Sequence, residues 1–191
     1  MEQNTYWLNV TILGGVLKKN SKTAFNIYLE LSRSNSEFQT RAKVCLAWSY
    51  LYGVGVDKNK IKAQDIFQEL IKNKSDQQNP AKFGLAKNYQ TDPLYYKMAF
   101  QLYSDLSKCK SDQQNSAKYE LARCYESGKG VMKDADKVYS LYLTLLTSED
   151  YRSKAFQRIA NYYKNKGDAE NSYKYYNLFF KMEEEKKKDN H

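Results

Sequence analysis

The chain has 191 residues, 41% of them hydrophobic, and a formal net charge of +9 at pH 7. Two prolines and eight glycines in a sequence rich in Lys, Gln, Glu, Leu and Ala favour an all-α fold over sheets with many turns. The positive net charge favours acidic proteins, nucleic acid or anionic membrane surfaces as partners. No run approaches roughly 18 consecutive apolar residues, so the sequence predicts no membrane span.

An internal copy is the clearest feature of the sequence. The segment 75–86, SDQQNPAKFGLA, returns 36 residues later as SDQQNSAKYELA at 111–122. Self-similarity at a period of roughly 20 to 50 residues indicates stacked supersecondary units, each touching only its neighbours. Such arrays usually work as binding surfaces.

The first repeat unit is predicted at about residues 5–37. Its first helix is expected over 5–17, around Leu13 and Gly14, and its second contains Ala24, Tyr28 and Leu31. No basic residue precedes Lys18 and no cleavage site is evident, so we interpret the start as a helix and not as a signal peptide. We therefore expect a cytoplasmic protein, or one exported by a route that leaves no cleavable leader.

Four later segments share the pattern A-x-x-x-[LI]-A-x-x-Y, which predicts the first helix of each unit, called helix A here. The residues at these recurring positions lie on one stripe of a helix with 3.6 residues per turn. The second alanine is small and lets a partner helix approach closely. The matches are Ala42/Leu46/Ala47/Tyr50, Ala81/Leu85/Ala86/Tyr89, Ala117/Leu121/Ala122/Tyr125 and Ala155/Ile159/Ala160/Tyr163.

The second helix of each unit, helix B, has a small or short residue, an aromatic residue four positions later and an apolar residue three after that. The matches are Ala63/Phe67/Leu70, Ala99/Tyr103/Leu106, Val138/Tyr142/Leu145 and Ser172/Tyr176/Phe179. Glycine-rich links at 52–56 and 128–131 can supply the left-handed residue that ends helix A. We reject a nucleotide-binding loop at these links because no strand precedes them.

The repeats are expected to form a single domain over residues 1–182. Its units span about 5–37, 38–77, 78–113, 114–149 and 150–182. After Met182 the apolar pattern stops, so residues 183–191, EEEKKKDNH, are predicted to be a charged flexible tail.

The composite pattern A-x-x-x-L-[AG]-x-x-Y-x-x-G-x-G-V-x-x-D-x-x-K-[AV] resembles the Sel-1-like repeat, a relative of the tetratricopeptide repeat. The unit at 114–149 matches it at Ala117, Leu121, Ala122, Tyr125, Gly128, Gly130, Val131, Asp134, Lys137 and Val138. The unit at 38–77 matches nearly as well, with Asn59 in place of the aspartate. The resemblance implies a right-handed superhelical solenoid of about five helix-turn-helix repeats. It also implies adaptor or scaffold work, often in bacterial proteins that meet host or envelope partners.

Residues that could carry catalysis or bind a metal are scarce. His191 is the one histidine and lies in the tail, which removes His-based triads and almost all histidine-containing metal sites. Cys45, Cys109 and Cys124 have no Cys-x-x-Cys spacing, so neither a disulfide framework nor a zinc site is suggested. Cys45 and Cys124 are interpreted as buried structural thiols. We expect no enzyme, no cofactor and no metal.

The concave groove of such a stack is expected along helix A, opposite its packing stripe. The columns there are aromatic with basic neighbours, and Trp, Tyr and Arg are frequent binding hot spots. The candidate partner-binding residues are Val44, Trp48, Phe83, Lys87, Tyr119, Arg123, Lys154 and Asn161. The alternative is that the rings pack inside the array and the basic residues are simply solvated.

These observations predict a non-catalytic scaffold or adaptor that binds an acidic or amphipathic segment of another protein in its groove. The abundance of Lys, Asn and Tyr is typical of an AT-rich genome, which together with the family suggests a bacterium and allows an effector acting on a host protein. The alternative is a helical-repeat protein that binds single-stranded nucleic acid, with rings stacking on bases beside Lys and Arg. No recurrent base-reading pair supports that alternative. The oligomeric state stays open.

Overall fold

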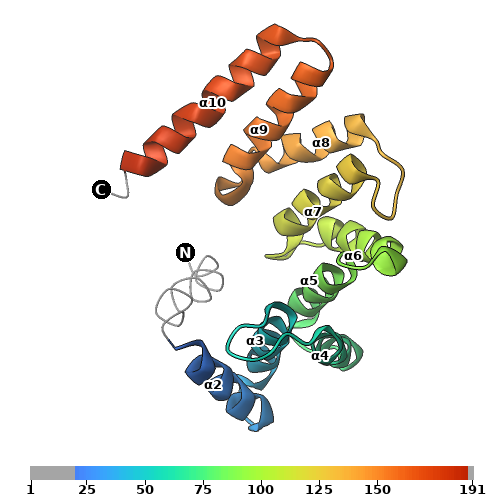
Figure 1. The fold of residues 1–191 in the computed structure, drawn as a ribbon, viewed down its shortest axis with the longest axis vertical. Coiled ribbons are helices and arrows are strands. Elements are labelled where there is room, and N and C mark those ends of the chain that lie inside the picture. Colours follow the sequence, from blue (N-terminus) through green and yellow to red (C-terminus); the bar gives the residue numbers. More distant parts are fainter. Residues whose placement is uncertain (1–19, 189–191) are drawn as a thin grey trace. The chain divides into compact units, whose positions relative to one another are not determined.

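The computed structural model describes residues 20–188, and within that range its regular structure is entirely helical (Figure 1). The elements in chain order are α2 (Ser21–Arg33), α3 (Gln39–Tyr52), α4 (Lys60–Lys72), α5 (Gln78–Tyr89), the short 3-10 helix η1 (Pro93–Tyr95), α6 (Tyr96–Lys108), α7 (Gln114–Ser127), α8 (Ala135–Leu145), α9 (Glu149–Asn165) and α10 (Ala169–Lys188). None of these helices is long and apolar enough to cross a membrane. The helix predicted at 5–17 and the tail residue His191 lie outside the described residues.

The chain divides into two compact units, with the boundary between Leu102 and Tyr103 inside α6. In the first unit α2 packs on α3, α3 on α4 and α4 on α5; in the second α7 packs on α8, α8 on α9 and α9 on α10. From α2 to α5 in the first unit, and from α7 to α10 in the second, each helix thus contacts the next one in sequence, as in a stack of helical hairpins. The single domain predicted over residues 1–182 stays a prediction.

The alanines of helix A are buried in each of α3, α5, α7 and α9. They are Ala42, Ala47, Ala81, Ala86, Ala117, Ala122, Ala155 and Ala160. Side chains this small let the backbones of two helices come close, so larger side chains from the partner helix can fill the space between them. This confirms the predicted packing stripe.

The central ring of helix B fills that space. Phe67, Tyr103 and Tyr142 have no exposed surface. The ring of Phe67 in α4 lies directly against Gly84 in α5, where an added β-carbon would come within 2.2 Å of the ring. Gly84 is therefore a site where helix B of one repeat closely approaches helix A of the next repeat.

Capping residues mark the turn between helices A and B. Gly53 and Gly128 end α3 and α7 in the left-handed conformation, with φ of 75° and 74°, which glycine adopts without steric cost. Asn59 Oδ1 accepts a hydrogen bond from the Lys62 amide at 2.9 Å, and Asp134 Oδ1 accepts one from the Lys137 amide at 2.9 Å. These bonds start α4 and α8, and the bond from the Lys137 amide lowers the pKa of Asp134.

The last helix continues beyond the predicted end of the domain. Residues 183–188, which we expected to belong to a flexible tail, form the final turns of α10. Glu183 accepts a hydrogen bond from Ser153 Oγ of α9 at 2.5 Å and pairs with Lys186 Nζ at 3.2 Å. Glu and Lys are good helix formers, and the pair three residues apart adds support.

Gly84→Ala should destabilise the protein, although replacing glycine by alanine at an exposed position inside a helix usually stabilises the helix by about 1 kcal/mol. The new methyl group would collide with the Phe67 ring, and such overpacking costs about 1–3 kcal/mol. Urea unfolding followed by circular dichroism measures the change. Introduced together with Phe67→Leu, the same substitution should cost much less; an equal cost in both backgrounds would mean that the ring is not the obstacle.

Candidate protein-binding surface

In the first of the two compact units, two of the predicted groove residues are buried. Val44 is 0% exposed and Phe83 5% exposed, so neither side chain offers a surface to a partner. Apolar side chains at this position of helix A are enclosed by the packing within the unit, so the partner binding predicted for Val44 and Phe83 has no exposed side chain to support it. Trp48 lies beside Phe83, with ring centroids 6.4 Å apart, and meets Phe67 edge-on at 5.6 Å.

Two predicted groove residues in the first unit keep partial exposure. Trp48 is half-buried and stacks on the exposed Tyr52, with centroids 5.5 Å apart and an interplanar angle of 9°. The half-buried Lys87 places Nζ 5.7 Å from the Phe83 ring centroid. What this unit exposes at the predicted groove is therefore one side of an internal aromatic cluster with Lys87 beside it.

In the second compact unit, the predicted groove residues Tyr119 and Lys154 lie beside Tyr151, which the sequence analysis did not select. Tyr119 of α7 lies 5.3 Å from Tyr151 of α9 between ring centroids. The exposed Lys154 places Nζ 5.6 Å from the centroid of Tyr119 and 5.5 Å from that of Tyr151. Tyr151 donates a hydrogen bond from its hydroxyl to Ser116 Oγ at 2.8 Å. This arrangement joins α7 to α9 and holds an ammonium group over two rings.

Arg158 belongs to the same surface, and the sequence analysis missed it. It lies one helical turn after Lys154 on α9, so its spacing of four from a predicted groove residue was the available signal. Its Nη1 is 3.6 Å from Glu126 Oε2, and Glu126 Oε1 accepts a hydrogen bond from Tyr142 at 3.3 Å. Partial burial lowers the pKa of Arg158, but the Glu126 carboxylate and the side chains of Tyr142 and Tyr119 together raise it by more. The guanidinium stays charged.

The last two predicted groove residues, Arg123 and Asn161, differ in their exposure and in their contacts. Arg123 of α7 is exposed, and its Nη1 lies 3.3 Å from Oε2 of Glu120, one turn earlier. Asn161 of α9 is half-buried, and its Oδ1 accepts a hydrogen bond from the Tyr176 hydroxyl at 2.6 Å. Asn161 therefore holds α10 against α9, whereas Arg123 presents its cation to solvent.

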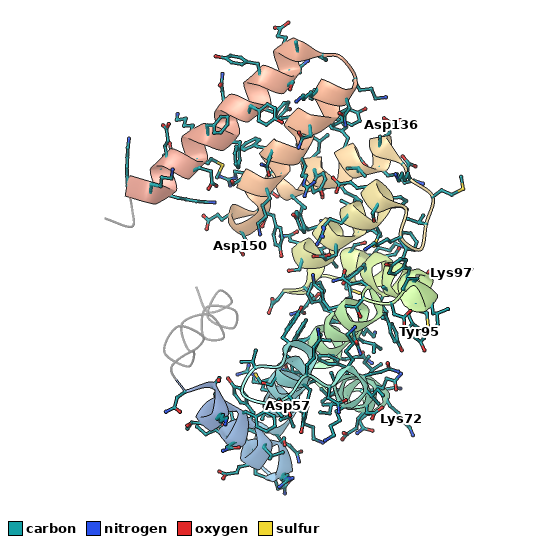
Figure 2. All side chains as sticks on the ribbon, in the orientation of Figure 1. Asp57, Lys72, Tyr95, Lys97, Asp136 and Asp150 are labelled. Carbon is teal, nitrogen blue, oxygen red and sulfur yellow. The ribbon has the colours of Figure 1, made fainter. Side chains whose placement is uncertain are left out.

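We name the surface formed by Tyr119, Arg123, Tyr151, Lys154 and Arg158 the basic aromatic patch. All five side chains come from α7 and α9 within the second unit. Figure 2 shows the side chains of both helices, with Asp150 labelled at the start of α9, one turn before Lys154. The patch combines rigid rings with three cations, which suits the recognition of carboxylate groups.

Residues 20–188 contain no group of three or more His, Cys, Asp or Glu side chains that could hold a metal ion. Cys45 is half-buried, Cys109 exposed and Cys124 buried, and all three are free of disulfides. Burial of Cys124 fits the structural role proposed for it.

The fold has relatives among solved structures, although no protein-family model matches the sequence and no curated protein sequence is similar to it. A structure titled "Crystal structure of MamA" superposes with a TM-score of 0.62 at 18% identity, over 90% of this chain and 93% of that one. A Sel1 repeat protein from Oxalobacter formigenes superposes with a TM-score of 0.56 at 19% identity, over 94% of this chain and 80% of that one. At these identities the likeness concerns the fold. It confirms the all-α repeat fold and the Sel-1-like resemblance that the sequence suggested.

Tyr142 gives the second unit a testable dependence on alkaline pH. Burial, and then the Glu126 carboxylate, raises the pKa of its phenol above the ordinary value of 10.0. Because the unfolded chain ionises first, the stability associated with this group is present below pH 10 and is lost as the pH rises further. In Tyr142→Phe, the free energy of unfolding should fall less steeply above about pH 10 than in the wild type.

The measurement is urea unfolding at a series of pH values between neutral and strongly alkaline. At neutral pH the variant should differ from the wild type by only about 0.5–1.5 kcal/mol, the net contribution of one hydrogen bond. Parallel slopes for the two proteins in the alkaline range would contradict the assignment.

Proposed function

We propose that this chain is a non-catalytic interaction scaffold that binds an acidic or amphipathic segment of another protein on the basic aromatic patch. The observation that carries the proposal is Lys154, whose ammonium group lies over the rings of Tyr119 and Tyr151. A lysine side chain that stays over two rings has fewer rotamers left to lose. A partner carboxylate that pairs with it therefore orders little further side chain on binding.

Arg123 and Arg158 extend the recognition of carboxylates to both sides of that cation. Each guanidinium carries five N–H donors in a planar fork, and each is paired with one glutamate of its own unit, Glu120 or Glu126. An incoming carboxylate can join these pairs and neutralise the excess of cations over anions. The rings of the patch supply contact area for apolar side chains of the same segment.

Long-range charge supports the same kind of partner. A net charge of +9 at pH 7 accelerates the encounter with an acidic protein, and salt screens that effect. Repeat folds of stacked helical hairpins commonly present binding surfaces. The same chemistry serves an adaptor in a bacterial cytoplasm and an effector that acts on a host protein.

Charge reversal on the patch tests the proposal. The probe is a fluorescently labelled amphipathic peptide with Leu on one helical face and Glu on the other, and its binding is followed by fluorescence anisotropy. Lys154→Glu combined with Arg158→Glu should weaken binding by about tenfold or more, since both cations contact the acidic face. A Lys-for-Glu version of the peptide should bind poorly to the wild-type protein.

The matched control reverses two exposed lysines of the same unit outside the patch, Lys133→Glu and Lys174→Glu, so the net charge changes equally. This control should retain most of the affinity. An equal loss in both double variants would show that net charge alone drives binding, and the patch would be rejected. Stronger binding of single-stranded RNA than of the acidic peptide, lost in the patch variant, would favour the nucleic-acid alternative instead.

A further inference from the structure

Two contacts between α7 and α9 lie on either side of Lys154 in the basic aromatic patch. Near the start of both helices, the Tyr151 hydroxyl donates to Ser116 Oγ at 2.8 Å. Further along both helices, Arg158 Nη1 lies 3.6 Å from Glu126 Oε2. The contact pairs follow the same order along α7 and α9, and Lys154 comes between them in the sequence of α9. The tertiary structure therefore holds the patch at both of its ends.

The second of these contacts is anchored in the core of the unit by Tyr142. This residue of α8 has no exposed surface, and its hydroxyl donates to Glu126 Oε1 at 3.3 Å. Its ring belongs to the core cluster that also contains Ala122 and Ile159. A side chain enclosed by close packing keeps its position, so its hydroxyl is a fixed donor for the carboxylate.

The two oxygens of Glu126 thus serve different partners. Oε1 accepts the bond from the buried hydroxyl of Tyr142, and Oε2 faces the Arg158 guanidinium. The carboxylate is itself mostly enclosed, with 29% of its side chain exposed. These contacts form a chain of three side chains that runs from α8 in the core, through α7, to α9 at the surface.

Arg158 is the member of this chain that a partner can reach, with 37% of its side chain exposed. Partial burial lowers its pKa, and the side chains of Glu126, Tyr142 and Tyr119 raise it. All three neighbours therefore lie close to the guanidinium. An arginine on an open helix samples many rotamers, whereas this one is restricted on the side that faces the array.

The ion pair of Arg123, the other arginine of the patch, is local to one helix. Its partner Glu120 lies one turn earlier on α7, and 51% of the Arg123 side chain is exposed. An ion pair between neighbours on one helix, with its cation largely in solvent, restrains the arginine weakly. Arg158 is thus placed by contacts that reach another helix and the core, and Arg123 by a pair within its own helix.

We infer that Glu126 is a positioning residue of the basic aromatic patch, which holds the Arg158 guanidinium in place for a partner carboxylate and is itself held by Tyr142. The inference rests on the proposed function, because it concerns how that same surface binds an acidic segment. A guanidinium that is already held loses less rotamer freedom when the carboxylate arrives. Its planar fork then offers its donors in a fixed geometry.

Glu126 is an acid beside a surface proposed to bind acids, so its two effects on binding have opposite signs. As a charge it repels a partner carboxylate, and its removal would strengthen binding. As a positioning residue it restrains Arg158, and its removal would weaken binding. At about 0.15 M salt the repulsion is screened over roughly 8 Å, whereas freeing a long side chain costs up to about tenfold in affinity. Positioning should therefore dominate.

The test measures how Glu126→Gln binds the labelled acidic peptide described above, at about 0.15 M salt. The amide oxygen of glutamine still accepts from Tyr142, but its NH2 group cannot pair with a guanidinium. The substitution thus keeps the core contact and releases Arg158. Fluorescence anisotropy should show binding weakened about threefold or more, although the net charge rises by one.

Tyr142→Phe tests the same chain from the core. It removes the hydroxyl that holds Glu126, and it should weaken peptide binding about twofold. Because Tyr142 has no exposed surface, this loss cannot come from a contact with the peptide. Circular dichroism checks that the variants are folded.

Glu170→Gln is the matched control for charge. It makes the same substitution at an exposed residue of α10 outside the patch, and it should bind the peptide at least as tightly as the wild type. Arg158→Ala is the background that isolates positioning. In that background, Glu126→Gln and Tyr142→Phe should leave the affinity nearly unchanged, because the side chain that they position is gone.

Two binding results would overturn the inference and leave the proposed function intact: binding by Glu126→Gln as tight as by Glu170→Gln, or the same loss with and without the Arg158 side chain. The free protein gives a third reading, since nitrogen-15 relaxation of the Arg158 Nε–Hε group should show a more mobile side chain in Glu126→Gln than in the wild type. Equal mobility would also overturn it. Failure of the proposed function looks different, because the wild-type protein itself would not bind the peptide, and the inference would fall with it.

Discussion

The close approach of helices A and B at paired alanines is the constraint on which this array depends. In the second unit, Ala122 and Ala155 lie in one core cluster with Tyr142 and Ile159. Side chains that end at the β-carbon leave room for a ring from the neighbouring helix, and the ring then excludes water from both backbones. The same device appears in the first unit, where Phe67 lies against Gly84.

This packing decides which part of helix A can meet a partner. Where the groove position carries Val44 or Phe83, the side chain is enclosed and the unit shows little polar surface there. Where it carries Tyr119, the phenol stays half-exposed and gathers cations from α9 around it. One column of a repeat can therefore be buried in the core in one unit and reach the surface in another, where we propose that it binds a partner.

Several features of this protein follow from the sequence alone. The recurring Ala, Leu and Tyr spacing predicted the helices and their buried stripe, because each column is sampled several times and a helix allows one face for that spacing. The caps at Gly53, Gly128 and Asn59 were equally legible, since few residues satisfy the ends of a helix. The acidic and basic run after Met182 was harder to interpret, because the same residues suit a solvated tail and the last turns of a helix.

Tertiary structure alone decided how much of each groove residue is exposed. Burial of Val44 and Phe83, the pairing of Asn161 with Tyr176 and the pairing of Arg158 with Glu126 all depend on side chains from neighbouring helices. The repeat pattern specifies which face of a helix points inward, since that follows from the local 3.6-residue period. It does not specify how far a ring from another helix reaches across that face, because this depends on the distance and angle between the two helices.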